Sequence, residues 1–170
     1  FTLDAATGAK ISGATYSTAS GSTTTPSGLA KISVWADDGD VDNTGLYAYG
    51  GDLNGDVWRF DLTATPLSPN PLKLAELKNG STQTQAVTTR PELGVCNYRK
   101  MIFVGTGRYL GASDLSNSQT QSVYGFKDEL GTTGLGNLHA SSSMVQQTMT
   151  TDGTGNKRTI TSNTVDLATK

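Results

Sequence analysis

The sequence predicts an all-β protein, a β-propeller segment of about two to three four-stranded antiparallel blades. Short apolar runs alternate with polar residues and are separated by turn-forming residues. No stretch repeats its apolar residues with the 3.6-residue period of a helix, so the only helical turn expected lies near residues 114–117. Aspartates also recur behind similar short strands, at Asp4, Asp61 and Asp128. Their spacings of 57 and 67 residues leave room for four strands and long surface loops in each repeat.

The clearest predicted element is a hairpin over residues 46–62. Its second strand, 57–62, alternates in character, which predicts one buried face made by Trp58, Phe60 and Leu62. Asn54 and Gly55 tolerate positive φ and predict a two-residue turn. The alternate polar residues around that turn, Asp52, Asn54 and Asp56, are therefore interpreted as turn residues in preference to a second cation loop.

All residues from 1 to 170 are expected to form part of one propeller domain, with approximate blades at 1–62 and 63–128 and an incomplete blade at 129–170. The strands expected in these blades cover residues 32–35, 46–49, 57–62, 72–74, 101–104, 122–126, 144–149 and 158–161. Because the chain starts at Phe1 and stops in mid-pattern, we expect it to be a piece of a longer protein. An open set of blades exposes strand edges, where the rest of the propeller or another chain is expected to pair.

Composition excludes several classes of function. Charged residues make up 16% of the chain and the net charge is −2, so there is no basic field for nucleic acid. No apolar run is long enough for a membrane span. The single cysteine, Cys96, excludes an internal disulfide and a thiolate metal cluster; it is expected as a small buried hydrophobe or as the partner of a cysteine elsewhere.

The sequence points to no catalytic residue, and we expect no enzyme. His139 is the only histidine and stands beside serines without a nucleophile elbow. Residues 105–111 superficially resemble a phosphate-binding loop, but the last glycine is one position late for the dinucleotide fingerprint. Five aromatic residues are expected in blade cores in preference to a carbohydrate platform: Trp35, Tyr47, Tyr49, Trp58 and Phe60.

Four segments occur in an informative order, at residues 4–8, 49–62, 89–92 and 104–111. Together they resemble the C-terminal propeller of the PilY/PilC family, the tip-associated biogenesis factors and adhesins of type IV pili. The resemblance implies a secreted, non-enzymatic protein at the pilus tip or cell surface, outer-membrane-associated in its parent. It also implies cooperation with minor pilins, support of pilus assembly against retraction, and adhesion to a host-surface receptor.

The resemblance further implies a calcium loop. Family members often carry Asp-x-Asn/Asp-x-Asp-x-x-x-Asp just before the hairpin, and residues 38–46 occupy that window. The implied ligands are the side chains of Asp38, Asp40 and Asp42 and the backbone carbonyl of Thr44.

The closing acid of this loop is missing, because Leu46 stands in its place. Calcium requires six to eight oxygen ligands, so Asp37, Asn43 or water must complete the site, and the affinity is expected in the weak range of about 10⁻⁴ to 10⁻³ M. The alternative is a solvated acidic turn between two strands.

Two other functions stay open at this point. Residues 3–8 also resemble the repeat of pyrroloquinoline-quinone propellers, which implies a quinoprotein oxidoreductase. A propeller scaffold for outer-membrane assembly is a third candidate.

Overall fold

The computed structural model describes residues 2–11, 15–64, 70–80 and 82–168. These residues confirm the all-β class. All strand pairs are antiparallel, and the described helices are two short 3₁₀ turns, neither of which could cross a membrane. The elements are β1 (Ile32–Trp35), β2 (Tyr47–Gly51), β3 (Asp56–Asp61), β4 (Leu72–Glu76), β5 (Lys78–Asn79), β6 (Gln83–Thr84), β7 (Glu92–Cys96), β8 (Arg99–Gly105), η1 (Ala112–Ser116), β9 (Val123–Lys127), η2 (Leu138–Ala140), β10 (Met149–Thr151) and β11 (Arg158–Ile160).

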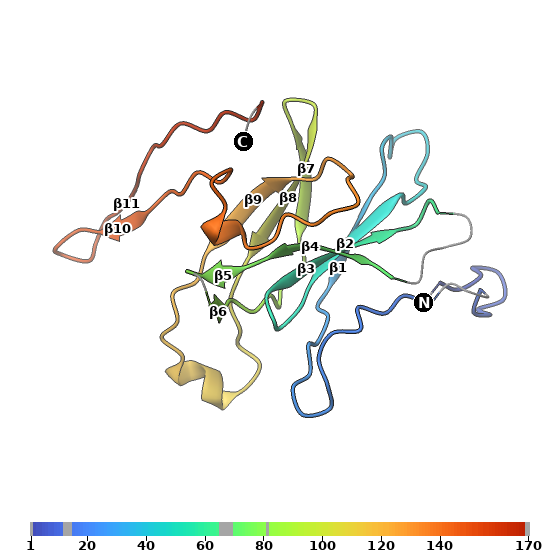
Figure 1. Cartoon of the computed structure of the whole chain (residues 1–170), viewed down its shortest axis with the longest axis horizontal. Helices are drawn as coiled ribbons and strands as arrows, with labels where there is room; N and C mark the ends of the chain where they lie inside the picture. Colours follow the sequence, from blue (N-terminus) through green and yellow to red (C-terminus); the bar gives the residue numbers. More distant parts are fainter. Residues whose placement is uncertain (1, 12–14, 65–69, 81, 169–170) are drawn as a thin grey trace.

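Two sheets form the body of the molecule, and two small hairpins lie outside them (Figure 1). The first sheet has the order β1-β2-β3-β4 and the second the order β7-β8-β9. Residues 72–74 were expected to open the second blade, but they lie in β4, which pairs with β3, with Val57 opposite Ala75, and completes the first sheet. The first sheet therefore extends beyond residue 62, whereas the division of the whole chain into blades of one propeller stays a prediction.

The hairpin between β2 and β3 is present, with a different turn. Gly55 N–H donates to the Asp52 carbonyl at 3.1 Å, and Asp52 N–H donates to the Asp56 carbonyl at 3.0 Å. Gly55 has φ +77°, so Leu53 and Asn54 form the centre of a β-turn and Gly55 follows in the left-handed conformation. The loop thus has three residues instead of the predicted two.

The main core lies between the two sheets. It combines Tyr49 and Val57 of the first sheet with Ile102, Val104 and Phe126 of the second. On the opposite face of the first sheet, Ala48, Trp58 and Phe60 form a second cluster. The predicted buried face is confirmed, because Trp58 and Phe60 are buried and Leu62 packs against them. The opposite face of β3 is covered as well, and even Arg59 is only 7% exposed.

The aromatic residues expected in the core lie there. Tyr49, Trp58 and Phe60 are buried, and Trp35 and Tyr47 are partly buried against the main core. Cys96 is instead exposed, because it ends β7 beside a tight turn whose residues, Asn97 and Tyr98, both have positive φ.

The three repeated aspartates share one local role. Each carboxylate accepts a hydrogen bond from the backbone N–H two residues later, of Ala6, Thr63 and Leu130 respectively. Aspartate favours this contact because its short side chain reaches its own backbone two residues on. The sequence repeat therefore marks equivalent turns.

Candidate functional site

The acidic loop between β1 and β2 is closed by backbone contacts. The Asp38 carbonyl accepts hydrogen bonds from the N–H groups of Val41, at 3.1 Å, and Asp42, at 2.7 Å. The Asp42 carboxylate accepts from the Thr44 hydroxyl at 2.5 Å and from the Thr44 N–H at 2.8 Å. These two bonds, the hydroxyl bond first, lower the pKa of Asp42. Asp42 therefore stabilises a local turn.

The proposed calcium ligands Asp38, Asp40, Asp42 and Thr44 all lie on this exposed loop. Across the described residues, no three or more acidic, histidine or cysteine side chains are grouped so that they could hold a metal ion. In this conformation the residues do not fit a calcium centre, because Asp42 is turned toward Thr44 and a closing acid is missing. Calcium binding stays a prediction that requires the loop to rearrange.

Asp37, expected as an additional ligand, contacts other groups. Its carboxylate accepts from Lys100 Nζ at 2.5 Å and from Trp35 Nε1 at 2.6 Å, and Lys100 Nζ lies 4.4 Å from the centre of the Trp35 ring. The hydrogen bond from Lys100, followed by that from Trp35, lowers the pKa of Asp37. Sequence reasoning missed Lys100, and no local signal identifies it, since it comes from β8 and ties the loop to the second sheet.

A buried polar cluster joins the sheets near the end of β9. Arg59 Nη1 donates to Asp128 Oδ1 at 2.7 Å, and Tyr49 Oη donates to Asp128 Oδ2 at 2.9 Å. Arg59 Nη2 also donates to the Gly131 carbonyl at 2.6 Å. Burial, then the nearby Asp128 charge, raises the pKa of Tyr49. The Tyr49 hydroxyl and both Arg59 Nη atoms thus donate to groups within the protein, so we assign this cluster to structure instead of catalysis.

Residues 105–111 form a loop that leads into η1. The Asp114 carboxylate accepts from Leu110 N–H and Arg108 Nε, each at 2.8 Å, and these contacts, the backbone bond from Leu110 first, lower the pKa of Asp114. The loop that superficially resembled a phosphate-binding loop therefore already has its Leu110 N–H bonded to a protein carboxylate. The same anchor holds Tyr109 and Leu110 at the surface, 72% and 67% exposed, close in sequence to Leu115, which is 73% exposed.

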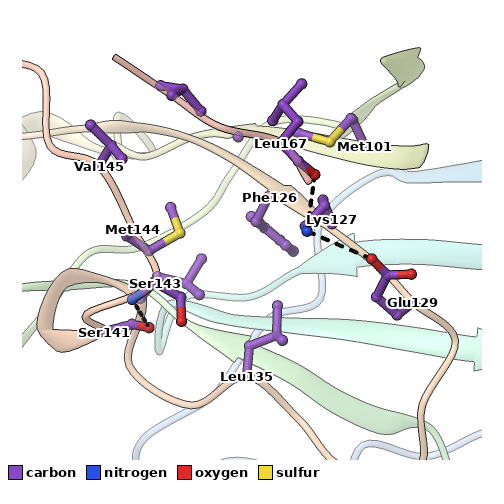
Figure 2. Close-up of a pocket in the computed structure, with 13 residues that line it drawn as sticks. Met101, Phe126, Lys127, Glu129, Leu135, Ser141, Ser143, Met144, Val145 and Leu167 are labelled. Atoms are coloured by element: carbon purple, nitrogen blue, oxygen red, sulfur yellow. Dashed lines mark hydrogen bonds and ion pairs between the residues drawn. The ribbon is translucent and has the colours of Figure 1, made fainter. Parts of the chain in front are cut away.

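A cavity of about 350 Å³ lies beside β9 (Figure 2). Phe126 and Met101 line it from the second sheet, and Met144 and Leu167 line it from segments late in the chain. Lys127 lies at one side, donating to the Leu167 carbonyl at 3.2 Å, with its Nζ 3.7 Å from Glu129. The cavity is mostly apolar and follows a strand, which favours an apolar side chain as its occupant.

Comparisons with known proteins agree on one family. Residues 3–161 match the family model described as the PilY1 beta-propeller domain. A type IV pilus biogenesis factor PilY1 homolog of Xylella fastidiosa is 34% identical over 112 residues, which cover 66% of this chain and 9% of the relative. The type IV pilus biogenesis factor PilY1 of Pseudomonas aeruginosa is 31% identical over 136 residues, which cover 64% of this chain and 11% of the relative.

The fold also matches a solved structure, the crystal structure of the Pseudomonas aeruginosa PilY1 C-terminal domain. The TM-score is 0.67 at 24% identity, over 86% of this chain and 37% of that one. The chain thus spans about a tenth of the length of the curated relatives. None of these matches supports the quinoprotein alternative.

Proposed function

This chain belongs to the PilY1 β-propeller domain family. We therefore propose that it serves as a propeller segment of a type IV pilus biogenesis factor. The observation that carries the proposal is the match of residues 3–161 to the family model, supported by the fold similarity over 86% of the chain. The role we assign is non-enzymatic: the chain presents surfaces to other proteins and acts in pilus assembly and surface adhesion.

Minor pilins or other pilus components are the partners we propose, at the cell surface or the pilus tip. The loop with Tyr109, Leu110 and Leu115 suits such contacts, because it exposes apolar side chains on a backbone anchored by Asp114. Aromatic residues on a rigid support contribute strongly to protein interfaces, since little side-chain freedom is lost on binding. A host-surface receptor is proposed as a second partner.

The proposal includes modulation of this role by calcium at the loop between β1 and β2. Its support is the alternation of Asp38, Asp40 and Asp42 in one exposed loop, which brings oxygen ligands close in sequence. Binding would require the loop to bring these three carboxylates together around one ion.

The proposal is tested in the organism that encodes the chain. We would replace the chromosomal copy by a version carrying Tyr109→Ser and Leu110→Ser, with Ile160→Ser as the matched control for an exposed apolar residue elsewhere, 62% exposed. Surface pili are counted by electron microscopy, and adhesion is measured per piliated cell, both with retraction intact and with retraction blocked.

Loss of pili that is restored when retraction is blocked would support a role in assembly against retraction. Normal piliation with reduced adhesion would support the receptor contact alone. If a complete deletion of residues 1–170 leaves piliation and adhesion unchanged, the proposed function is wrong. Co-purification with outer-membrane assembly proteins instead of pilins would favour the scaffold alternative.

A further inference from the structure

The loop between β8 and β9, residues 106–122, is closed at its base. Thr106 N–H donates to the Ser122 carbonyl at 2.9 Å, and Ser122 N–H donates to the Thr106 hydroxyl at 2.8 Å. Asp114 ties residues 108–111 together from within. In Figure 1 the loop projects beyond the ends of the two strands, next to β6. Compact loops with adjacent ends are often functional, and these contacts fix the shape of this one.

The position of the loop relative to the first sheet depends on residues 84–89. On one side of this segment, Val87 N–H donates to the Asp52 carbonyl, in the turn between β2 and β3, at 2.9 Å. On its other side, the Ala86 carbonyl accepts from Gly107 N–H of the loop at 2.8 Å. The segment therefore links the hairpin of the first sheet to the loop of the second.

Gln85 supplies the side-chain part of this link. It is fully buried, which is unusual for glutamine, and its backbone N–H donates to the Leu77 carbonyl at 2.9 Å. Its Nε2 donates to the Thr120 carbonyl at 2.8 Å and to the Ser122 hydroxyl at 3.0 Å, while its Oε1 accepts from the Tyr124 hydroxyl at 2.7 Å. Because a carbonyl oxygen only accepts, the amide nitrogen has to face Thr120. Both amide N–H groups are thus used on the loop, and a displaced loop would leave them buried without partners.

A shallow hollow shows why the position of the loop matters. It has a volume of about 320 Å³ and is lined by Leu53 from the turn between β2 and β3 and by Arg108 and Leu110 from the loop. The surface around Leu110 is therefore built from both sheets. A protein that contacts Leu53 and Leu110 together depends on their spacing, and it binds more tightly if that spacing is fixed beforehand.

We propose that Gln85 is a positioning residue: its side-chain amide fixes the loop, with Tyr109, Leu110 and Leu115, relative to the first sheet. The positioning rests on the contacts of Gln85 alone, whereas its consequence for pilus assembly and adhesion rests on the proposed function. Without the amide, the loop keeps its internal contacts and moves relative to residues 84–89.

The test measures amide exchange by NMR on the whole chain. Gln85→Met keeps the length of the side chain and removes both donors. We expect exchange at Gly107, whose N–H bonds to the neighbouring Ala86, to become about tenfold faster. Exchange at Leu110, which bonds to Asp114 inside the loop, should stay within about twofold of wild type.

Tyr124→Phe is the matched control. It removes the buried hydrogen bond on the other side of the same amide and leaves both donors to the loop in place. A general loss of stability would affect both variants alike, so only Gln85→Met should speed exchange at Gly107. In the chromosomal copy, Gln85→Met should lower piliation or adhesion as Tyr109→Ser with Leu110→Ser does, and Tyr124→Phe should not.

Ser122→Ala, which removes one acceptor of the amide, serves if Gln85→Met does not fold, and should speed exchange at Gly107 about threefold. Unchanged exchange at Gly107, or equal acceleration in Tyr124→Phe, would overturn the positioning role. Faster exchange with normal piliation and adhesion, while Tyr109→Ser with Leu110→Ser impairs them, would overturn its functional consequence. If neither variant impairs them, the proposed role of the loop is wrong, and faster exchange at Gly107 still supports the positioning by Gln85.

Discussion

Arg59 and Asp128 form an ion pair that joins the two sheets across a separation of 69 residues in sequence. Their nitrogen and oxygen atoms are 2.7 Å apart, and their side chains are 9% and 2% exposed. The Tyr49 hydroxyl and the Leu130 N–H complete the carboxylate's partners. Because a buried charge is costly without partners, this pair requires both sheets to hold one arrangement.

Breaking the pair should strongly destabilise the chain. Asp128→Ala leaves Arg59 buried and unpaired, and we expect a loss of about 3–5 kcal/mol in the free energy of unfolding, measured by urea denaturation. Replacing both residues, as Arg59→Met with Asp128→Leu, should recover at least half of that loss. The control is Glu129→Gln, which breaks the exposed contact with Arg99 and should cost at most about 1 kcal/mol. Similar effects of Asp128→Ala and Glu129→Gln would contradict the structural role of the pair.

Glu76 should make the chain sensitive to acid. Hydrogen bonds from Lys73 and then Lys78 lower the pKa of Glu76 from 4.5 to about 2. Since the folded pKa is the lower one, the stabilisation is present above pH 4.5 and is lost as the pH falls from 4.5 toward 2.

Glu76→Gln should therefore reduce the free energy of unfolding at pH 6 by about 1 kcal/mol, a value suited to a partly exposed ion pair. The difference from wild type should shrink toward pH 2. Urea denaturation at each pH measures it, with Glu92→Gln, whose side chain is 69% exposed, as the control. A difference that does not change between pH 6 and pH 2 would contradict the pKa direction.

Gly51 should not tolerate a side chain. A Cβ at this position would lie 2.4 Å from a Val87 methyl carbon, and Val87 is fully buried. Gly51→Ala should cost about 1–3 kcal/mol in thermal or urea unfolding, because a filled core cannot take an added methyl group without distortion. Gly105→Ala is the matched control, since a Cβ there meets nothing within 4 Å. Equal stability of the two variants would show that the space around Gly51 is not closed.

The proposed calcium loop should bind calcium weakly and through its own aspartates. A calorimetric titration should show saturable binding in the range of about 10⁻⁴ to 10⁻³ M, lost in Asp40→Asn. Asp152→Asn is the control, because Asp152 caps another exposed turn through Thr154. If wild type releases no heat, or if Asp40→Asn binds equally well, residues 38–44 form only an acidic turn.

The amino-acid sequence by itself determined the all-β class, the hairpin over residues 46–62 and the repeat of Asp4, Asp61 and Asp128. These features depend on local chemistry: side chains alternate across a strand, and an aspartate bonds to the backbone two residues later. Even the helical turn near residue 114 was predictable, and η1 lies there.

Only the tertiary structure decided which faces are covered and which partners meet. The alternation of side chains along β3 distinguishes its two faces, but it does not reveal that a second sheet covers the face with Arg59. Likewise, Asp42 bonds to Thr44 and Asp37 to Lys100, contacts that the spacing of the aspartates does not reveal. The pairing of β4 with β3 follows from how segments that are not adjacent in the hairpin pack, which local patterns do not encode.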